Sequence, residues 1–141
     1  MNIVQISPEA VPFAKTGGLS DMVTGLAKAL DAAGHRVTLI IPHHRQLTPV
    51  ELAGTTTGQI ISIQLGRQST QAWVRKARVP DSRVEALLID HPGYFDRPGL
   101  YGTKEHGDYA DNPERFTFFS RAAIEACIAF DLQPDILHAH D

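Results

Sequence analysis

The sequence is poor in the residues and segments that mark several classes of protein. It has a single cysteine, Cys127, so no internal disulfide can form, and its place in a helical pattern indicates a small buried side chain rather than a nucleophile. No run approaches the roughly 20 apolar residues that span a bilayer. The N-terminus also lacks the charged start and the long apolar stretch of a signal peptide. These absences predict a cytoplasmic protein that does not enter a membrane.

Basic residues are neither in excess nor gathered into a long run. The chain of 141 residues carries 13 Lys and Arg against 16 Asp and Glu, which gives a net charge of −3. Basic and aromatic residues do not alternate, so nucleic acid is excluded as the expected partner. The share of hydrophobic residues, 43%, is that of an ordinary globular domain with one core.

The two common nucleotide-binding motifs are missing as well. The glycine pair in residues 15–19 fits neither Gly-x-Gly-x-x-Gly nor Gly-x-x-x-x-Gly-Lys-[Ser/Thr]. The segment nevertheless combines three features that suit a phosphate: Lys15 is a cation, Gly17 and Gly18 admit close approach to the backbone, and a helix N-terminus follows. On these residues alone, a flexible connection that happens to contain a lysine stays open.

Hydrophobic periodicity predicts a βαβ unit at the start of the chain. Residues 2–7 have the pattern of a buried strand, residues 19–30 that of a helix ended by Gly34, and residues 37–41 that of a second strand. The helical stripe consists of Leu19, Met22, Val23, Leu26, Ala27 and Leu30. Two strands joined in this way are parallel, and ligands of such sheets bind beyond the carboxyl ends of the strands.

The middle of the chain predicts strands of another kind. Apolar and polar residues alternate in 59–65 and again in 71–79, which favours an antiparallel pair with one solvated face. The second of these segments carries Trp73 and a basic cluster, expected to be a solvated face, with a polymer-binding surface as the minority alternative. Residues 84–89 are apolar and are expected to return to the main sheet.

The last third is predicted to contain a long loop, a helix and a final strand. Residues 90–112 are rich in Pro and Gly and are expected to be a functional or mobile loop. Asn112 is the expected helix cap and Pro113 the first helical residue. The apolar stripe of this helix consists of Phe116, Phe119, Ala123, Ile124 and Cys127. A short strand over 135–139 follows.

Histidines form two further candidate sites. On a strand, His138 and His140 share one face and Asp141 follows at the tip, a spacing that permits metal binding as in metal-dependent hydrolases. Two histidines and one carboxylate are a weak metal motif, so a structural role or a substrate contact is favoured. His43 and His44 follow the second strand and are expected to be solvated.

Four segments, in this order, resemble the glycogen synthases of bacteria and the starch synthases of plants. They are residues 15–21 (Lys-Thr-Gly-Gly-Leu-Ser-Asp), 94–102 (Tyr-Phe-Asp-Arg-Pro-Gly-Leu-Tyr-Gly), 111–116 (Asp-Asn-Pro-Glu-Arg-Phe) and 134–141 (Pro-Asp-Ile-Leu-His-Ala-His-Asp). The resemblance implies an α/β fold with a Rossmann-like, mainly parallel sheet. It also implies a retaining glucosyltransferase of the two-domain GT-B type that moves glucose from ADP-glucose to the non-reducing end of an α-1,4-glucan without a metal or cofactor.

The resemblance also assigns roles to residues. It makes Lys15 a donor-binding residue, with the backbone of Gly17 and Gly18 offered to the phosphates. It places Asp141 in the catalytic cleft, and Asp21 and His140 within reach of the substrates.

Two departures from the family pattern matter. Ser20 stands where the family often has glycine, which leaves the lysine and both glycines intact. The chain is also much shorter than such enzymes, so residues 1–141 are expected to be the first part of the N-terminal domain, with the C-terminal domain absent and no transferase activity in isolation. The metal-dependent hydrolase and a carbohydrate-binding module centred on Trp73 stay as alternatives. The sequence does not decide between ADP-glucose and UDP-glucose.

Overall fold

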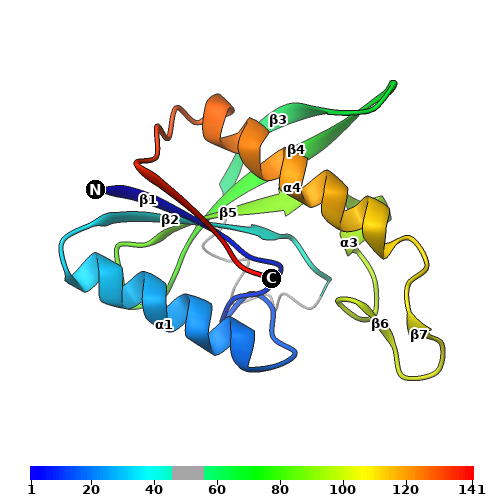
Figure 1. The fold of residues 1–141 in the computed structure, drawn as a ribbon, viewed down its shortest axis with the longest axis horizontal. Helices are drawn as coiled ribbons and strands as arrows, with labels where there is room; N and C mark the ends of the chain where they lie inside the picture. Colours follow the sequence, from blue (N-terminus) through cyan, green and yellow to red (C-terminus); the bar gives the residue numbers. More distant parts are fainter. Residues whose placement is uncertain (46–55) are drawn as a thin grey trace.

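A computed structural model describes residues 1–45 and 56–141, in which six strands form one sheet in the order β3-β4-β5-β2-β1-β8 (Figure 1). A separate hairpin is formed by β6 and β7. The elements in chain order are β1 (Asn2–Ile6), α1 (Gly18–Ala32), β2 (Arg36–Pro42), β3 (Thr56–Leu65), β4 (Gln68–Arg78), β5 (Glu85–Asp90), α3 (Pro92–Phe95), β6 (Gly102–Thr103), β7 (Gly107–Asp108), α4 (Asn112–Ala129) and β8 (Ile136–Ala139).

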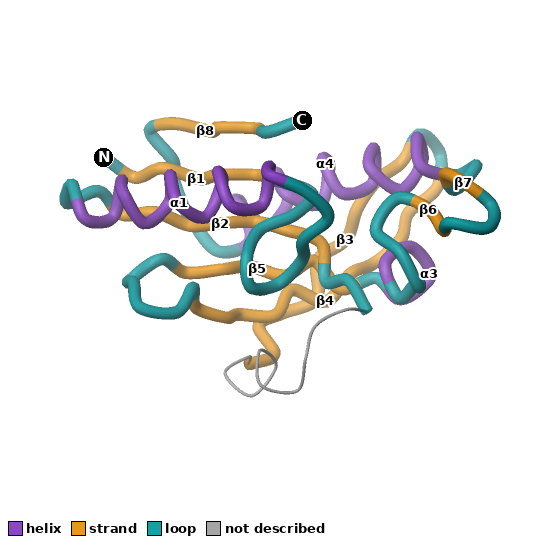
Figure 2. The backbone as a smooth tube through the Cα atoms, turned by 90° about the horizontal axis from the view of Figure 1, so that it is seen from below, coloured by secondary structure: helices purple, strands orange, loops and turns teal. Residues whose placement is uncertain are grey.

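The parallel part of the sheet confirms the predicted βαβ unit. β1 pairs in parallel with β2, Ile3 lying opposite Val37, and β2 pairs in parallel with β5. β8 pairs with the other side of β1 in the same direction, so it forms one edge of the sheet (Figure 2). All four strands therefore end at the same side of the molecule, the side where sheets of this kind bind ligands.

β3 and β4 form the antiparallel part that the alternating sequence predicts. They pair with each other, and β4 also pairs antiparallel with β5, which joins them to the parallel strands. In β4, Ala72 and Val74 are buried while Trp73 between them is exposed, so the strand has one solvated position between two core positions.

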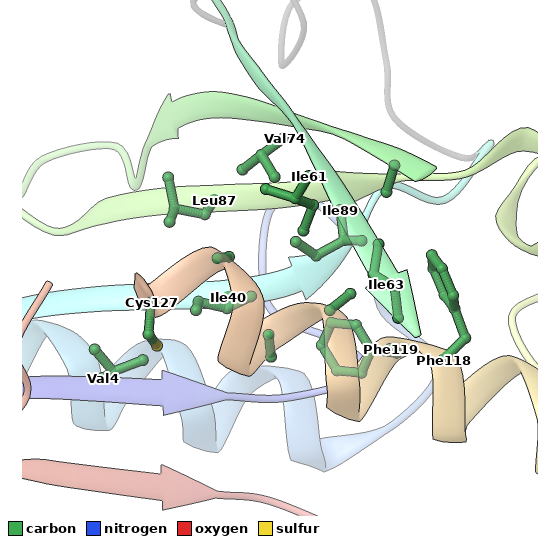
Figure 3. Packing of buried hydrophobic residues seen from close by; sticks show 14 of the residues in the cluster. Val4, Ile40, Ile61, Ile63, Val74, Leu87, Ile89, Phe118, Phe119 and Cys127 are labelled. Carbon is green, nitrogen blue, oxygen red and sulfur yellow. The ribbon is translucent and has the colours of Figure 1, made fainter. Parts of the chain in front are cut away.

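The two long helices cover opposite faces of the sheet (Figure 1). On one face, Phe118 of α4 packs in a cluster with Ile40 and Ile89 (Figure 3). On the other face, Val23 of α1 packs in a cluster with Leu39. Neighbouring residues of β2 thus belong to different clusters, which explains why its stretch from Leu39 to Ile41 is apolar on both faces rather than alternating.

The buried face of α1 is shifted by one position from the predicted stripe. Met22, expected in the core, is 48% exposed, whereas Ser20 and Thr24 are buried. Both hydroxyls have backbone partners in the preceding loop: Ser20 Oγ donates to the carbonyl of Gly17, and Thr24 Oγ1 donates to that of Val11. These hydrogen bonds make the burial of two polar residues favourable, and hydrophobic periodicity does not detect them.

Residues 90–112, expected to be a loop, contain α3 and the β6–β7 hairpin. α4 begins at Asn112 as predicted, but Asp111 occupies the N-cap position, so the expected capping by Asn112 is wrong. The Asn112 side chain instead donates to the carbonyl of Tyr101 and accepts from Arg115. Ile124, expected in the apolar stripe of α4, is 39% exposed.

No helix in the described ranges has the length and apolar character needed to cross a membrane.

Candidate active site

The candidate site lies at the carboxyl edge of the sheet, where two segments far apart in the sequence meet. The loop of residues 7–17 follows β1, and His140 and Asp141 follow the neighbouring strand β8. The backbone N–H of His140 donates to the carbonyl of Ile6 over 2.9 Å. The glycine loop and the chain end therefore leave the sheet from adjacent strands.

Lys15 stands on the surface of this edge and is paired with Asp21. Its Nζ lies 2.6 Å and 2.8 Å from the two carboxylate oxygens of Asp21, which is in the first turn of α1. The two side chains are 55% and 57% exposed. Water and salt screen such a pair, which contributes at most about 1 kcal/mol to stability. An anion that approaches the start of α1 can therefore compete with Asp21 for the ammonium group.

Gly17 and Gly18 leave open space above the first turn of α1. Gly17 occupies the N-cap position with an extended backbone (φ −154°, ψ −157°) and provides no side-chain cap. A Cβ at either glycine would have no neighbour within 4 Å, and neither residue has a positive φ. Within the described residues, neither packing nor backbone geometry requires glycine here. The first N–H groups of the helix are thus left for water or for a ligand.

A buried carboxylate that sequence reasoning missed lies under this loop. Glu9 is 3% exposed, and it accepts hydrogen bonds from the Thr16 backbone N–H (2.6 Å), the Thr16 hydroxyl (2.8 Å) and the Tyr101 hydroxyl (3.0 Å). Burial, followed by the charge of Glu9, raises the pKa of Tyr101, so this hydroxyl stays neutral and donates. The available signal was a charged residue directly after a buried strand, between Pro8 and Pro12.

His138 and His140 lie against each other at the chain end, in agreement with the predicted strand face. Their ring centroids are 4.1 Å apart and the ring planes are inclined by 31°. His140 is buried, and its Nε2 has no hydrogen-bond partner among the described residues. Burial, and then the neighbouring His138, lowers the pKa of His140. A neutral imidazole with an unpaired nitrogen therefore lies beside the exposed Asp141.

The geometry gives no support to the metal site. In residues 1–45 and 56–141, no group of three or more His, Cys, Asp or Glu side chains is arranged to hold a metal ion. His138 and His140 contact each other through tilted rings.

The basic cluster of β4 is largely the solvated face that was expected, since Lys76 and Arg78 are exposed and only Arg75 is half-buried. Arg75 Nε donates to the buried Asp90 over 2.7 Å, and Lys76 lies over the ring of Phe130 with its Nζ 5.0 Å from the centroid. Trp73 is 46% exposed and sits on β4, three strands away from β1. The residues of this candidate surface are thus partly engaged within the protein and lie outside the glycine loop.

His43 and His44, expected to be solvated, are mostly buried. His44 is 1% exposed, its Nε2 lies 3.0 Å from the carbonyl of Pro8, and its ring packs edge-on against Phe95. His43 Nδ1 lies 3.7 Å from a carboxylate oxygen of Asp90. The expectation is wrong because the segments after β1, β2 and β5 pack against one another. His44 thereby fixes the residue that precedes Glu9.

Burial of His44 predicts a loss of stability in mild acid. Desolvation is the main cause that lowers its pKa from 6.5 to about 4 in the folded chain. Below pH 6.5 the unfolded chain takes up a proton at this residue that the folded chain refuses. The stability that the neutral, buried His44 permits is therefore fully present above pH 6.5 and is lost as the pH falls toward 4. The free energy of unfolding is expected to drop by about 2 kcal/mol between pH 7 and pH 4.5.

His44→Gln tests this prediction, since its amide keeps a donor for the Pro8 carbonyl and does not titrate. The free energy of unfolding is measured in urea at pH 7 and at pH 4.5. The drop between the two pH values is expected to be about 2 kcal/mol smaller in His44→Gln than in the original chain. His106→Gln serves as the matched control, because His106 is exposed in the β6–β7 connection. Equal pH dependence in His44→Gln and the original chain would contradict the prediction.

Comparison with known proteins gives one consistent result. The family model described as the starch synthase catalytic domain matches residues 2–141. A glycogen synthase of Elusimicrobium minutum is 43% identical over the whole chain, and glycogen synthase 2 of Geobacter sulfurreducens is 36% identical. The chain spans 29% and 28% of the lengths of these two relatives.

A solved structure shares the fold. The catalytic domain of starch synthase IV from Arabidopsis thaliana, bound to ADP and acarbose, matches with a TM-score of 0.83 and 31% sequence identity. The match covers 99% of this chain and 27% of the other. Together with the strand order, it confirms the predicted α/β fold with a mainly parallel, Rossmann-like sheet of the GT-B type.

Proposed function

This chain belongs to the glycogen and starch synthase family, and on that premise we propose that it takes part in transferring glucose from ADP-glucose to an α-1,4-glucan. In this reaction the bond between the anomeric carbon and the diphosphate breaks, a new bond forms to the 4-hydroxyl at the non-reducing end, and the configuration is retained. The acceptor hydroxyl gives up its proton, and ADP leaves. No metal or cofactor is needed.

The observation that carries the proposal is the arrangement at the start of α1. Lys15 presents an exposed ammonium group beside Gly17 and Gly18, whose open space no described side chain fills. A diphosphate seated there would meet the ammonium and the first N–H groups of the helix. Negative charge grows on the diphosphate as it leaves, so donors fixed at this position favour the transition state over the bound donor.

The acceptor side of the proposal rests on the chain end. His140 has an unpaired Nε2 and a neutral ring, which suits a hydrogen bond to a sugar hydroxyl. Asp141 is exposed next to it and is the proposed catalytic-cleft carboxylate. The ion pair with Lys15 places Asp21 beside the proposed diphosphate position, where it orients the ammonium until the donor arrives.

The rest of the proposal concerns the complete gene product. Residues 1–141 are assigned to the first part of the N-terminal Rossmann-like domain, so that they form one wall of a cleft between two domains. The remaining groups of the donor site would come from the second domain. The single cysteine, Cys127, is buried and free, which suits the reducing cytoplasm, where we place the protein.

An incorporation assay tests the function. The complete gene product is incubated with ADP-glucose labelled in the glucose and with glycogen, with and without EDTA, and label in the glucan is measured. Label is expected in the glucan at the same rate in both conditions. Release of free glucose that EDTA abolishes would favour the hydrolase instead, and absence of label would refute the proposal. A parallel reaction with UDP-glucose decides which nucleotide is preferred.

A further inference from the structure

Glu9 is an unusual carboxylate, because it is buried and its described partners are neutral. Its oxygens accept from the Thr16 N–H, the Thr16 hydroxyl and the Tyr101 hydroxyl, at 2.6, 2.8 and 3.0 Å. The residue is 3% exposed. Hydrogen bonds to an ionised acceptor are about twice as strong as those between neutral groups, and three of them offset part of the cost of burying the charge.

The backbone around Glu9 is fixed on both sides. The Ser7 hydroxyl donates to the carbonyl of Glu9 over 2.8 Å and accepts from the Glu9 N–H over 3.4 Å. The neutral His44 ring holds the carbonyl of Pro8. Glu9 therefore projects from a fixed point just after β1, the strand next to the edge strand β8.

The groups that Glu9 holds belong to two otherwise separate segments. Thr16 lies between Lys15 and Gly17, in a stretch that is exposed to solvent over residues 15–18. Tyr101 directly precedes β6. A shallow pocket of about 350 Å³ lies between these segments and is lined by Thr16, residues 99–101 and most residues of the β6–β7 hairpin.

We propose that Glu9 is a positioning residue that locks the Lys15–Gly18 loop and Tyr101 into one arrangement before the donor binds. This inference rests on the proposed function, since it assigns to Glu9 the preorganisation of that donor site. Both Glu9 oxygens bind Thr16, so the peptide that connects Thr16 to Lys15 is held in one orientation. A donor that meets a fixed loop does not have to order it on binding.

Direct contact between Glu9 and the donor is excluded by its chemistry. A carboxylate repels a diphosphate, and Glu9 is covered by the loop that it holds. Its effect must therefore pass through Thr16 to the neighbouring Lys15. If Glu9 acts in this way, the effect of a Glu9 substitution on the KM for ADP-glucose depends on whether Lys15 is present. A general contribution to stability would give the same effect with or without Lys15.

Kinetics of the complete gene product test the inference. Glu9→Ala is expected to raise KM for ADP-glucose about tenfold with less than about a twofold change in KM for glucan. Glu9→Gln should be intermediate, because its amide oxygen still accepts from the Thr16 N–H while the two hydroxyls turn to accept from its NH₂ group. Tyr101→Phe, which removes one of the three bonds, should shift the donor KM in the same direction by less.

A double variant gives the decisive comparison. If Glu9 acts through the loop that carries Lys15, Glu9→Ala should raise the KM for ADP-glucose much less in the Lys15→Ala variant than in the original protein. Equal costs in both backgrounds, or an unchanged donor KM in Glu9→Ala, would overturn the inference. Glu85→Ala is the matched control, since Glu85 is exposed at the start of β5, the opposite end of the parallel strands.

Hydrogen exchange supplies a readout that needs no activity. The Thr16 amide is expected to be protected, and Glu9→Ala should speed its exchange at least about tenfold, while amides of β1 keep their protection. An unprotected Thr16 amide in the original chain would overturn the inference even if the enzyme is active. If the original protein elongates no glucan, the proposed function fails, and the exchange result still decides whether Glu9 holds the loop.

Discussion

Lys15→Ala is expected to lower kcat/KM for ADP-glucose about a hundredfold in the complete gene product, the scale of losing one preorganised charge-stabilising donor. The loss should fall on kcat as well as on KM, because the diphosphate carries more negative charge in the transition state than in the bound donor. Steady-state kinetics at varied ADP-glucose and saturating glycogen measure both constants.

The same substitution should leave the fold intact. The Lys15–Asp21 pair is more than half exposed, so its loss changes the free energy of unfolding by no more than about 1 kcal/mol. Lys28→Ala provides the control, because Lys28 lies further along α1, away from the site edge. An unaltered donor KM and kcat in Lys15→Ala, or an equal loss in Lys28→Ala, would refute the role assigned to Lys15.

Residues 1–141 on their own are expected to show no glucan elongation. The proposed donor groups are Lys15 and the start of α1, and the proposed acceptor-side groups are His140 and Asp141. They leave the sheet from the adjacent strands β1 and β8, so all of them belong to one side of the proposed cleft. Holding both reactants in register contributes several orders of magnitude to such reactions, and one wall cannot enforce it. The relatives that share this fold are more than three times as long.

The comparison requires matched samples. The 141-residue chain and the complete gene product are assayed with the same labelled ADP-glucose and glycogen, after circular dichroism has shown that the shorter chain is folded. Background incorporation by the short chain beside clear incorporation by the complete product is the expected result. Elongation by the short chain at a comparable rate would show that the second wall is dispensable.

Elements with a strong local period were predicted closely. The apolar runs of β1 and β2 and the helical period of α1 depend on contacts that repeat every two or every three to four residues, so the sequence displays the existence and extent of these elements directly. Met22 shows the limit of this reasoning. Its spacing suits the core, but Ser20 and Thr24 take the buried positions because their hydroxyls reach backbone carbonyls of the preceding loop.

The region from 90 to 112 shows a second limit. Its Pro and Gly content predicted a loop, yet it contains α3 and a hairpin whose strands are two residues each, too short to display a period. Asn112 illustrates the same point at a single position. Its side chain suits a cap, but tertiary contacts with Tyr101 and Arg115 use its hydrogen-bonding groups instead.

The sequence by itself determined the βαβ start, the antiparallel pair of β3 and β4, the family and the residues of the glycine loop, because each depends on short segments whose pattern or motif is local. Only the tertiary structure decided that Glu9 lies under that loop, that the Tyr101 hydroxyl donates to Glu9, and that His44 is buried against Pro8. These contacts join residues that are distant in the chain, and a side chain's neighbours across such distances depend on how the strands are ordered in the sheet. No local pattern records that order.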